Sequence, residues 1–255
     1  MVAVSSPPTL PGLQRWLALD SSAGVLSVAV GPAGGDALAW HVGAGGPQAS
    51  ATLLPVIGAL LQRVGWRLAE LDGIVLAHGP GSFTGLRTAC AVVQGLAAAA
   101  RPGGLPVLPL STLLAVAESA RQRHAPAAAA LRVHAALDAR MDEVYVASYA
   151  WDAAQGWSEL AAPRLSRPQD LPSDADALHA GNVAEVYAGR LPPVWQGEPA
   201  AHTEPCARAL LRLAAAGVHR GGCVAASAAQ PLYVRNKVAL TVDEQAALRA
   251  ARQAG

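Results

Sequence analysis

The most informative segment of the chain is GIVLAHGPGSFTGLR, residues 73–87. Its first part, residues 73–78, is a continuous apolar run of the kind found in buried parallel strands. Residues 79–87 then contain three glycines and a proline, which allow a sharp turn, and Ser82 or Thr84 can cap a following helix. A buried strand, a glycine-rich turn and a helix in this order indicate an α/β fold.

The sequence on either side extends this unit to a complete lobe. Upstream, strand-like runs occur at residues 16–20, 25–30 and 36–41, and apolar residues recur at helical spacing from residue 50. Downstream, a short strand is expected at residues 106–109, and a further helix begins at Ser111. The first 125 residues therefore predict the order βββαβαβα, a mixed sheet covered by helices.

The second half of the chain resembles the first at an offset of 118 residues, which is the separation of Asp20 and Asp138. Residues 18–20 and 136–138 both read ALD, and each triplet ends an apolar run before a tight turn. We interpret this as a duplication, with chance matching in an alanine- and leucine-rich chain as the alternative. The predicted architecture is a two-lobed α/β fold with duplicated βββαβαβα lobes.

This interpretation divides the chain into three parts. We expect a disordered leader at residues 1–14, which are rich in serine and proline, and an N-terminal lobe at residues 15–110. A C-terminal lobe would follow at residues 111–255. Its last helix, at residues 242–252, could pack on either lobe.

Composition excludes several classes of protein. A formal net charge of +1 without a dense basic block argues against strong nucleic-acid binding by this chain alone. Three cysteines without CxxC spacing predict neither a disulfide framework nor a zinc site, and fit a reducing cytoplasm. The longest apolar stretch, residues 89–100, is well short of the roughly 20 residues of a membrane span. We therefore expect no membrane anchor.

The glycine-rich turn is also a candidate phosphate or nucleotide site, formed by Gly79, Gly81 and Ser82. Backbone N–H groups at the start of a helix bind anions readily. The turn lacks the Gly-Lys-Ser/Thr ending of a P-loop, however, and its glycines do not match GxGxxG. A purely structural tight turn is the alternative.

Two aspartates, Asp20 and Asp138, occupy equivalent places in the two halves, and Ser21 follows the first of them. Carboxylates at such positions could orient a metal-bound phosphate or act as a base. The alternative is that each aspartate accepts hydrogen bonds from its own turn. Their equivalent placement points to a shared nucleotide cleft, whether functional or vestigial.

Histidine and cysteine spacing suggests no metal site and no catalytic nucleophile. The seven histidines include no pair three to five residues apart, which disfavours an HExxH or HxxxH site. The sequence contains no GxSxG elbow and no recognisable Cys/His pair. We therefore assign no catalytic residue and no metal ligand.

Four segments, taken together, resemble the TsaB family, the partner subunit of the bacterial machinery that makes threonylcarbamoyladenosine beside the tRNA anticodon. They are LALDSS at residues 17–22, GPGSFTGLR at 79–87 with QGLA at 94–97, LDARMDEVY at 137–145 and PLYVRN at 231–236. The second and third segments are highly specific in combination, and the resemblance extends over residues 15–240.

This resemblance implies the fold of the actin-like and sugar-kinase ATPase superfamily. It further implies a non-catalytic subunit that pairs with a catalytic TsaD-like subunit, joined by a TsaE-like ATPase, with tRNA held only through the complex. No cofactor of its own is implied, although ATP or ADP could bind at a complex interface. Two enzymatic alternatives stay open: a phosphotransferase or ATPase using Asp20 and Asp138, and a metallopeptidase-like relative.

The resemblance also places the contact with TsaD on two helices of the first lobe. The implied interface residues are Leu53, Leu54, Ile57, Leu61, Thr88, Ala89, Val92 and Leu96. The alternative is that part of this surface simply covers the sheet. If the same surface binds a second copy, the isolated chain is a homodimer. One departure is Ala49, which stands where family members often carry a histidine.

Overall fold

The computed structural model describes residues 12–46, 49–196 and 206–235. Residues 1–11 of the expected leader and the helix expected at residues 242–252 lie outside these ranges. From Gly12 onward the chain is attached to the first lobe, because the Trp16 indole donates to the Gly12 carbonyl and the Ala33 N–H donates to the Leu13 carbonyl. The part of the expected leader that the structure describes is therefore ordered.

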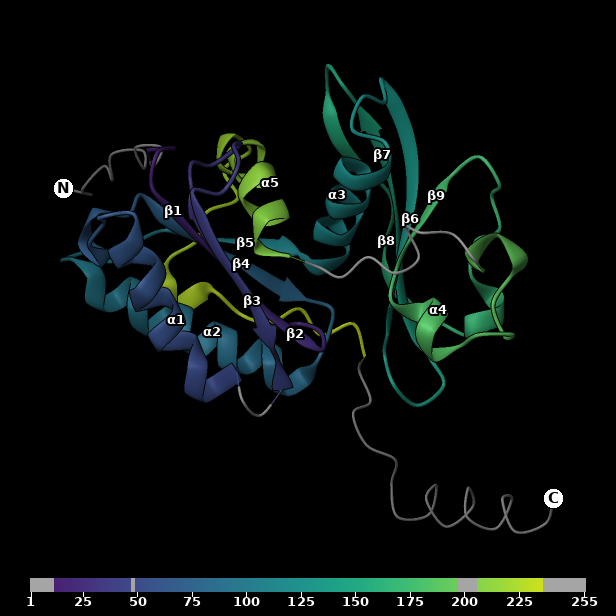
Figure 1. The fold of residues 1–255 in the computed structure, drawn as a ribbon, viewed down its shortest axis with the longest axis horizontal. Coiled ribbons are helices and arrows are strands. Elements are labelled where there is room, and N and C mark those ends of the chain that lie inside the picture. Colours follow the sequence, from purple (N-terminus) through teal and green to yellow (C-terminus); the bar gives the residue numbers. More distant parts are fainter. Residues whose placement is uncertain (1–11, 47–48, 197–205, 236–255) are drawn as a thin grey trace, which may run out of the picture.

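The first lobe has the predicted order of elements (Figure 1). They are β1 (Trp16–Asp20), β2 (Val25–Gly31), β3 (Ala39–Ala44), α1 (Ala49–Arg63), β4 (Gly73–Gly79), α2 (Phe83–Ala100), β5 (Val107–Ser111) and α3 (Thr112–His124). The strands form one sheet in the order β3-β2-β1-β4-β5, in which β1 is antiparallel to β2 and parallel to β4. The mixed sheet predicted from the apolar runs is confirmed.

Helices cover both faces of this first sheet. α1 and α2 pack on one face, where Leu53 and Val93 join Leu19 and Leu76 in a core cluster. A later helix, α5 (Ala207–His219), packs on the opposite face. Because both faces are covered, all five residues of β1 are buried, which explains why the strand is apolar almost throughout.

The second lobe repeats the strand order of the first in reduced form. Its elements are β6 (Ala130–Asp138), β7 (Val144–Asp152), β8 (Gly156–Ser166), β9 (Leu178–Gly181) and the short helix α4 (Val183–Val186). The sheet order β8-β7-β6-β9 matches β3-β2-β1-β4, with β6 antiparallel to β7 and parallel to β9. The internal similarity between ALD at residues 18–20 and 136–138 therefore reflects equivalent strand ends.

The full βββαβαβα plan predicted for the second lobe is wrong. Only a single 3-10 turn, η3 (Pro168–Asp170), stands between β8 and β9 where the first lobe has α1, and no described strand corresponds to β5. Short helices and the residues that connect them take over the covering role, since Leu171, Val183, Leu191 and Trp195 are buried against this sheet face. The second lobe buries its sheet without a second long helix.

The boundary predicted at residue 110 also needs correction, because the C-terminal part of the chain returns to the first lobe. α5 packs on β1, β2 and β4, and Val224 forms an isolated antiparallel bridge with Val107 of β5. α3 lies between the two lobes, in contact with both β6 and α5. Residues 207–235 therefore belong largely with the N-terminal lobe or span the two lobes.

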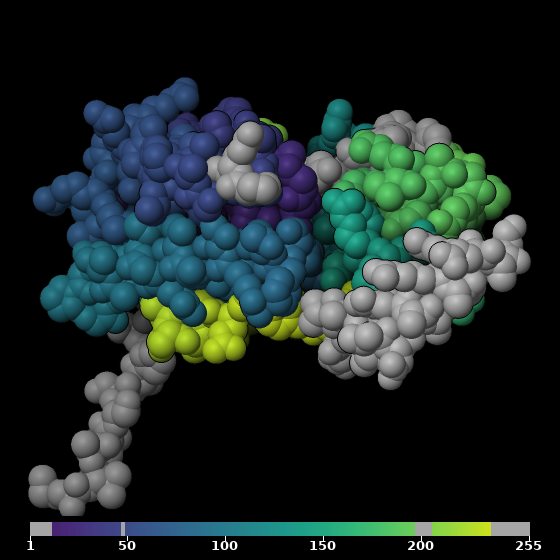
Figure 2. All heavy atoms as spheres, turned by 90° about the horizontal axis from the view of Figure 1, so that it is seen from below, coloured from purple at the N-terminus to yellow at the C-terminus, as the bar shows by residue number. Residues whose placement is uncertain are grey.

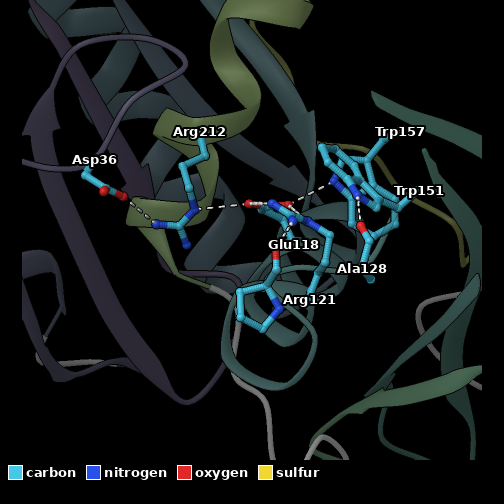
Figure 3. A network of polar contacts seen from close by, with 8 residues as sticks. Asp36, Glu118, Arg121, Ala128, Trp151, Trp157 and Arg212 are labelled. Atoms are coloured by element: carbon cyan, nitrogen blue, oxygen red, sulfur yellow. Dashed lines mark hydrogen bonds and ion pairs between the residues drawn. The ribbon is translucent and has the colours of Figure 1, made fainter. Parts of the chain in front are cut away.

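A buried polar network joins the lobes at α3 (Figure 3). The Glu118 carboxylate accepts hydrogen bonds from Arg121 of the same helix at 2.9 Å, from the Trp157 indole of β8 at 3.0 Å and from Arg212 of α5 at 3.1 Å. Arg212 also pairs with the exposed Asp36 at 3.2 Å. The Glu118 carboxylate thus links β8 of the second lobe to α5, which packs on the first lobe.

Candidate functional site

A cavity of about 520 Å³ opens between the lobes, at the ends of β1, β6 and β9. Open α/β sheets commonly bind ligands beyond the carboxyl ends of their strands. The cavity is lined by both lobes and by the C-terminal segment. Its lining includes Ser22, Gly24, Gly45, Gly81, Ser82, Phe83, Thr84, Asp138, Arg140, Met141, Tyr145, Asn182, Leu232, Tyr233 and Arg235.

The cavity brings together half of the predicted phosphate-site residues. Gly81, Ser82 and Asp138 line it. Asp20, Ser21 and Gly79 are not among its lining residues, and they shape the turns behind it. The two strand ends reach the cavity unequally, through Ser22 of the turn after Asp20 and through Asp138 itself.

Asp20 is directed into its own turn. Its Oδ1 accepts hydrogen bonds from the Ser22 N–H at 2.8 Å and from the Ser22 hydroxyl at 2.5 Å. Its Oδ2 is buried and has no hydrogen-bond partner among the described residues. Desolvation by burial raises the pKa of this carboxyl, against the opposing effect of the Ser22 hydrogen bonds. Asp20 therefore holds the β1–β2 turn in place.

Asp138 is occupied in a similar way. Its Oδ1 accepts from the Arg140 N–H at 2.8 Å and from the Tyr187 hydroxyl at 2.7 Å, and its Oδ2 lies 3.3 Å from the Arg140 guanidinium. Burial, together with the hydrogen bond to Asp138, raises the pKa of Tyr187, so this hydroxyl stays a donor. The carboxylate lines the cavity but is already bonded within its own lobe.

The turn after Asp138 has an uncommon backbone. Arg140, Met141 and Asp142 have φ angles of 62°, 57° and 59°, three consecutive non-glycine residues in the left-handed region. Arg235 from the C-terminal segment stabilises this turn by donating to the Ala139 carbonyl at 3.1 Å. Strained backbone of this kind concentrates at functional sites.

The C-terminal segment 230–235 closes one side of the cavity and connects the lobes. The Leu232 N–H donates to the His78 carbonyl at 2.7 Å in the first lobe, and Arg235 pairs with Glu143 at 2.7 Å in the second. The segment PLYVRN at residues 231–236 is a recognisable motif, but no site residue is predicted in it from the sequence. A role for Tyr233 and Arg235 depends on contacts with residues about 90 to 150 positions away, which no local pattern reveals.

An aromatic and cationic cluster marks the start of α2 beside the cavity. The Arg87 guanidinium lies 3.7 Å from the centre of the Phe83 ring and donates to the Tyr233 hydroxyl at 2.9 Å. The Phe83 and Tyr233 rings are 5.4 Å apart, and both are partly exposed. This cluster links the C-terminal segment to α2.

The glycine-rich turn packs α2 tightly against the β1–β2 turn. Ser82 is the N-cap of α2 as expected, since its hydroxyl accepts from the Gly85 N–H at 3.4 Å. Ser21 donates its hydroxyl to the Gly85 carbonyl at 2.8 Å, and a Cβ on Gly85 would lie against the Ser21 carbonyl. Gly79 has a φ of +126°, which a larger residue adopts rarely. The structural role of this turn is thus visible, while anion binding stays a prediction.

The predicted partner interface requires a correction. Leu53, Ile57, Leu61 and Ala89 are buried in the core of their own lobe and are not available to a partner. The remaining four reach the surface: Leu54 is 53% exposed, and Thr88, Val92 and Leu96 are partly exposed. The error has a simple cause, because residues at helical spacing identify the stripe that faces the sheet, and the partner must meet the other side.

The outer side of α1 and α2 is nonetheless an unusual surface (Figure 2). The two helices lie side by side on one face, and Arg63 and Arg87 are their only charged residues. α2 is long and apolar enough to cross a membrane by length and composition alone. Of its 18 residues, Phe83–Ala100, 33% are buried within the protein. It packs on the first sheet through residues such as Leu86 and Val93 and leaves an apolar side uncovered.

Comparison with known proteins shows the family of this chain. The chain is 32% identical over 199 residues to the Escherichia coli (strain K12) tRNA threonylcarbamoyladenosine biosynthesis protein TsaB, a match covering 73% of this chain and 80% of that protein. The chain belongs to the TsaB family. The Haemophilus influenzae TsaB is also 32% identical over 197 residues, covering 73% of this chain and 79% of that protein.

Solved structures and a family model agree with this TsaB assignment. YeaZ from Pseudomonas aeruginosa superposes with a TM-score of 0.73 at 35% identity, covering 87% of this chain and all of that one. A second structure, described as similar to peptidase YeaZ from the same organism, has a TM-score of 0.74 at 36% identity, covering 88% of this chain and all of that one. Residues 47–171 match the family model "TsaD: tRNA N6-adenosine threonylcarbamoyltransferase". The predicted actin-like ATPase fold class is confirmed.

Proposed function

We propose that the chain acts in tRNA threonylcarbamoyladenosine biosynthesis as a non-catalytic subunit that binds and activates a TsaD-like catalytic subunit. Membership of the TsaB family supports the process. The observation that carries the docking role is the outer side of α1 and α2, which is apolar and, apart from Arg63 and Arg87, without charge. We call this the α1–α2 surface and define it by Leu54, Thr88, Val92 and Leu96.

Small side chains make the α1–α2 surface suitable for another helix. Gly58 and Ala59 on α1, and Ala91 and Gly95 on α2, are exposed beside the larger apolar residues. A Cβ on Gly58 or Gly95 would meet nothing within 4 Å, so the helix backbone is accessible at these points. Close backbone approach favours helix–helix packing, with Leu54, Val92 and Leu96 as the apolar contacts.

The non-catalytic part of the proposal is supported by the state of the two aspartates. Asp20 is buried in its turn, and Asp138 is bonded to Arg140 and Tyr187. Within residues 12–46, 49–196 and 206–235, no three histidine, cysteine or acidic side chains are grouped to hold a metal ion. The chemistry is therefore assigned to the catalytic partner.

The other members of the assembly follow from the same proposal. We expect a TsaE-like ATPase to join the pair, ATP or ADP to bind at an interface of the complex, and tRNA to be held through the complex in the cytoplasm. A net charge of +1 supports indirect tRNA binding. Nucleotide titration of the isolated chain and of the complex is the measurement, and tight binding to the isolated chain would contradict an interface site.

Substitution of Val92 by arginine tests the docking role. Val92→Arg places a charge in an apolar contact, so we expect affinity for the TsaD-like subunit to fall at least tenfold, about 1.4 kcal/mol or more. Val186→Arg is the matched control, because Val186 is an exposed valine on α4 of the other lobe. Affinity is measured by calorimetry and product by reconstituted tRNA threonylcarbamoylation. Equal affinity of the two variants, or full product when the chain is omitted, would overturn the proposal.

A further inference from the structure

The segment at residues 229–235 is held by both lobes, and we call it the strap. On the first lobe, the Leu232 N–H donates to the His78 carbonyl at 2.7 Å. The Gln94 side chain of α2 donates to the Ala229 carbonyl at 2.8 Å. The strap is therefore attached both to the end of β4 and to the helix that carries half of the α1–α2 surface.

On the second lobe, a single side chain anchors the strap. The Arg235 guanidinium donates to the carbonyls of Ala139 and Arg140 at 3.1 and 3.2 Å and pairs with Glu143 at 2.7 Å. This side chain is only 13% exposed, and a buried arginine needs such partners. All three contacts reach from the strap to the second lobe. They can form together only while that lobe lies close to the strap.

The strap also fixes the position of one charge at the α1–α2 surface. Arg87 lies on the outer stripe of α2, which continues at four-residue spacing through the exposed Ala91 and Gly95. Its guanidinium points back towards the start of the helix, 3.7 Å from the centre of the Phe83 ring and 2.9 Å from the Tyr233 hydroxyl of the strap. The charge is thus held away from the apolar part of the surface.

We infer that the strap is a switch for docking: while Arg235 is anchored in the second lobe, Tyr233 holds Arg87 back, and release of the anchor frees this charge. Side chains four residues apart on a helix are neighbours, so a freed Arg87 can lie over Ala91. A partner that docks there must then bury or displace a charged group, which costs binding free energy. The inference rests on the docking role proposed above and adds that the arrangement of the lobes regulates it.

Coupling of this kind acts in both directions. A partner that binds only when Arg87 is held back favours the anchored strap by the same factor. Tyr233 and Arg235 line the cavity between the lobes, so the anchored strap closes one side of it. Docking on α2 is therefore communicated to the space between the lobes.

The first test needs no partner and is independent of docking. The Arg87 Nε–H is bonded to the Tyr233 hydroxyl, so its exchange with water, followed by NMR, reports how firmly the guanidinium is held. Arg235→Gln weakens the anchor, and we expect this exchange to accelerate by about threefold or more. Arg190→Gln is the matched control, because Arg190 pairs with Asp142 of the same turn at 2.9 Å but lies outside the strap. Equal exchange rates in the two variants would overturn the inference.

Affinity for the TsaD-like subunit, measured by calorimetry, provides the second test. Tyr233→Phe keeps the ring and removes the hydroxyl, and it also covers the case in which Arg235→Gln fails to fold. We expect each strap variant to weaken docking by about three- to tenfold, the value of one hydrogen bond. Arg190→Gln should leave the affinity unchanged. In an Arg87→Ala background no charge remains to be held back, so both losses should disappear.

Two results would count against the switch, and neither is the result that removes the docking role. If Val92→Arg weakens docking while Tyr233→Phe and Arg235→Gln do not, the docking role stands and the strap has no part in it. If the strap variants weaken docking equally with and without the Arg87 side chain, the strap does not act through this charge. The inference is overturned in both cases.

Discussion

At the scale of single residues, the second sheet contains a buried histidine pair that the sequence analysis did not single out. The His134 and His179 rings lie 5.5 Å apart, and His179 stacks edge-on against Trp195 at 4.9 Å. His134 exchanges a 2.7 Å hydrogen bond with Ser148, while Nε2 of His179 has no partner among the described residues. Burial lowers the pKa of His179 to about 4, with a further contribution from His134.

This arrangement predicts acid sensitivity of folding. A histidine that titrates near 6.5 when unfolded and near 4 when folded binds its proton more readily in the unfolded chain. The stabilising effect of the neutral ring is complete above pH 6.5 and is lost as the pH falls towards 4, by about 3 kcal/mol in total. His179→Phe should flatten the dependence of the unfolding free energy on pH between 7 and 4. The exposed His219→Asn is the control, and equal slopes for both variants would contradict the prediction.

At the scale of elements, α2 shows how one helix serves two surfaces. Its inner side carries Gly85, which the Ser21 carbonyl touches so closely that no side chain fits. Its outer side carries Gly95, around which a Cβ would find open space. Two glycines on one helix therefore have opposite structural meanings, and only their surroundings distinguish them.

This contrast yields a matched pair of alanine substitutions. Gly85→Ala forces α2 away from the β1–β2 turn and should lower the free energy of unfolding by about 1–3 kcal/mol. Gly95→Ala relieves the backbone entropy cost of a helical glycine and should raise it by roughly 0.5–1 kcal/mol, while weakening docking on the α1–α2 surface. Chemical denaturation and binding calorimetry measure both effects. A Gly85→Ala variant as stable as the parent would show that the close contact is not required.

At the scale of the whole molecule, Glu118 links elements of the two lobes. This side chain is buried between α3, α5 and β8 and is bonded to an arginine from each of the two helices. Desolvation acts to raise its pKa, but hydrogen bonds from Arg121 and Trp157 outweigh this effect and hold the pKa below its usual value. The carboxylate is therefore ionised at neutral pH and compensates two guanidinium groups.

Removal of this charge should loosen the connection between the lobes. Glu118→Gln leaves Arg121 and Arg212 without their shared anion, so we expect a loss of about 3 kcal/mol in unfolding free energy at neutral pH. Hydrogen exchange should accelerate in α3 and α5. Glu70→Gln is the control, because Glu70 pairs with Arg67 at the surface, where an ion pair contributes little. Similar exchange rates in the two variants would argue against an interlobe role.

The sequence was sufficient for some parts of the candidate site and insufficient for others. The Ser82 cap follows from a local motif, and the structure confirms it. Asp138 lines the cavity, whereas Asp20 does not. Other contacts of the site join distant residues. Tyr187 donates a hydrogen bond to Asp138, 49 positions away, and Arg235 donates one to the Ala139 carbonyl, 96 positions away. Partners at such separations leave no local periodicity.

The element order of the first lobe is predictable from the amino-acid pattern alone, because a strand covered on both faces is apolar throughout and a covered helix shows a 3.6-residue period. It could not decide that α5 joins the first lobe, or that Leu53 and Ile57 face inward while Leu54 and Val92 reach the surface. An apolar stripe indicates that one face of a helix is buried, but it does not show which surface packs on that face. Only the tertiary structure supplies the opposing surface, and with it the side of each helix that stays free.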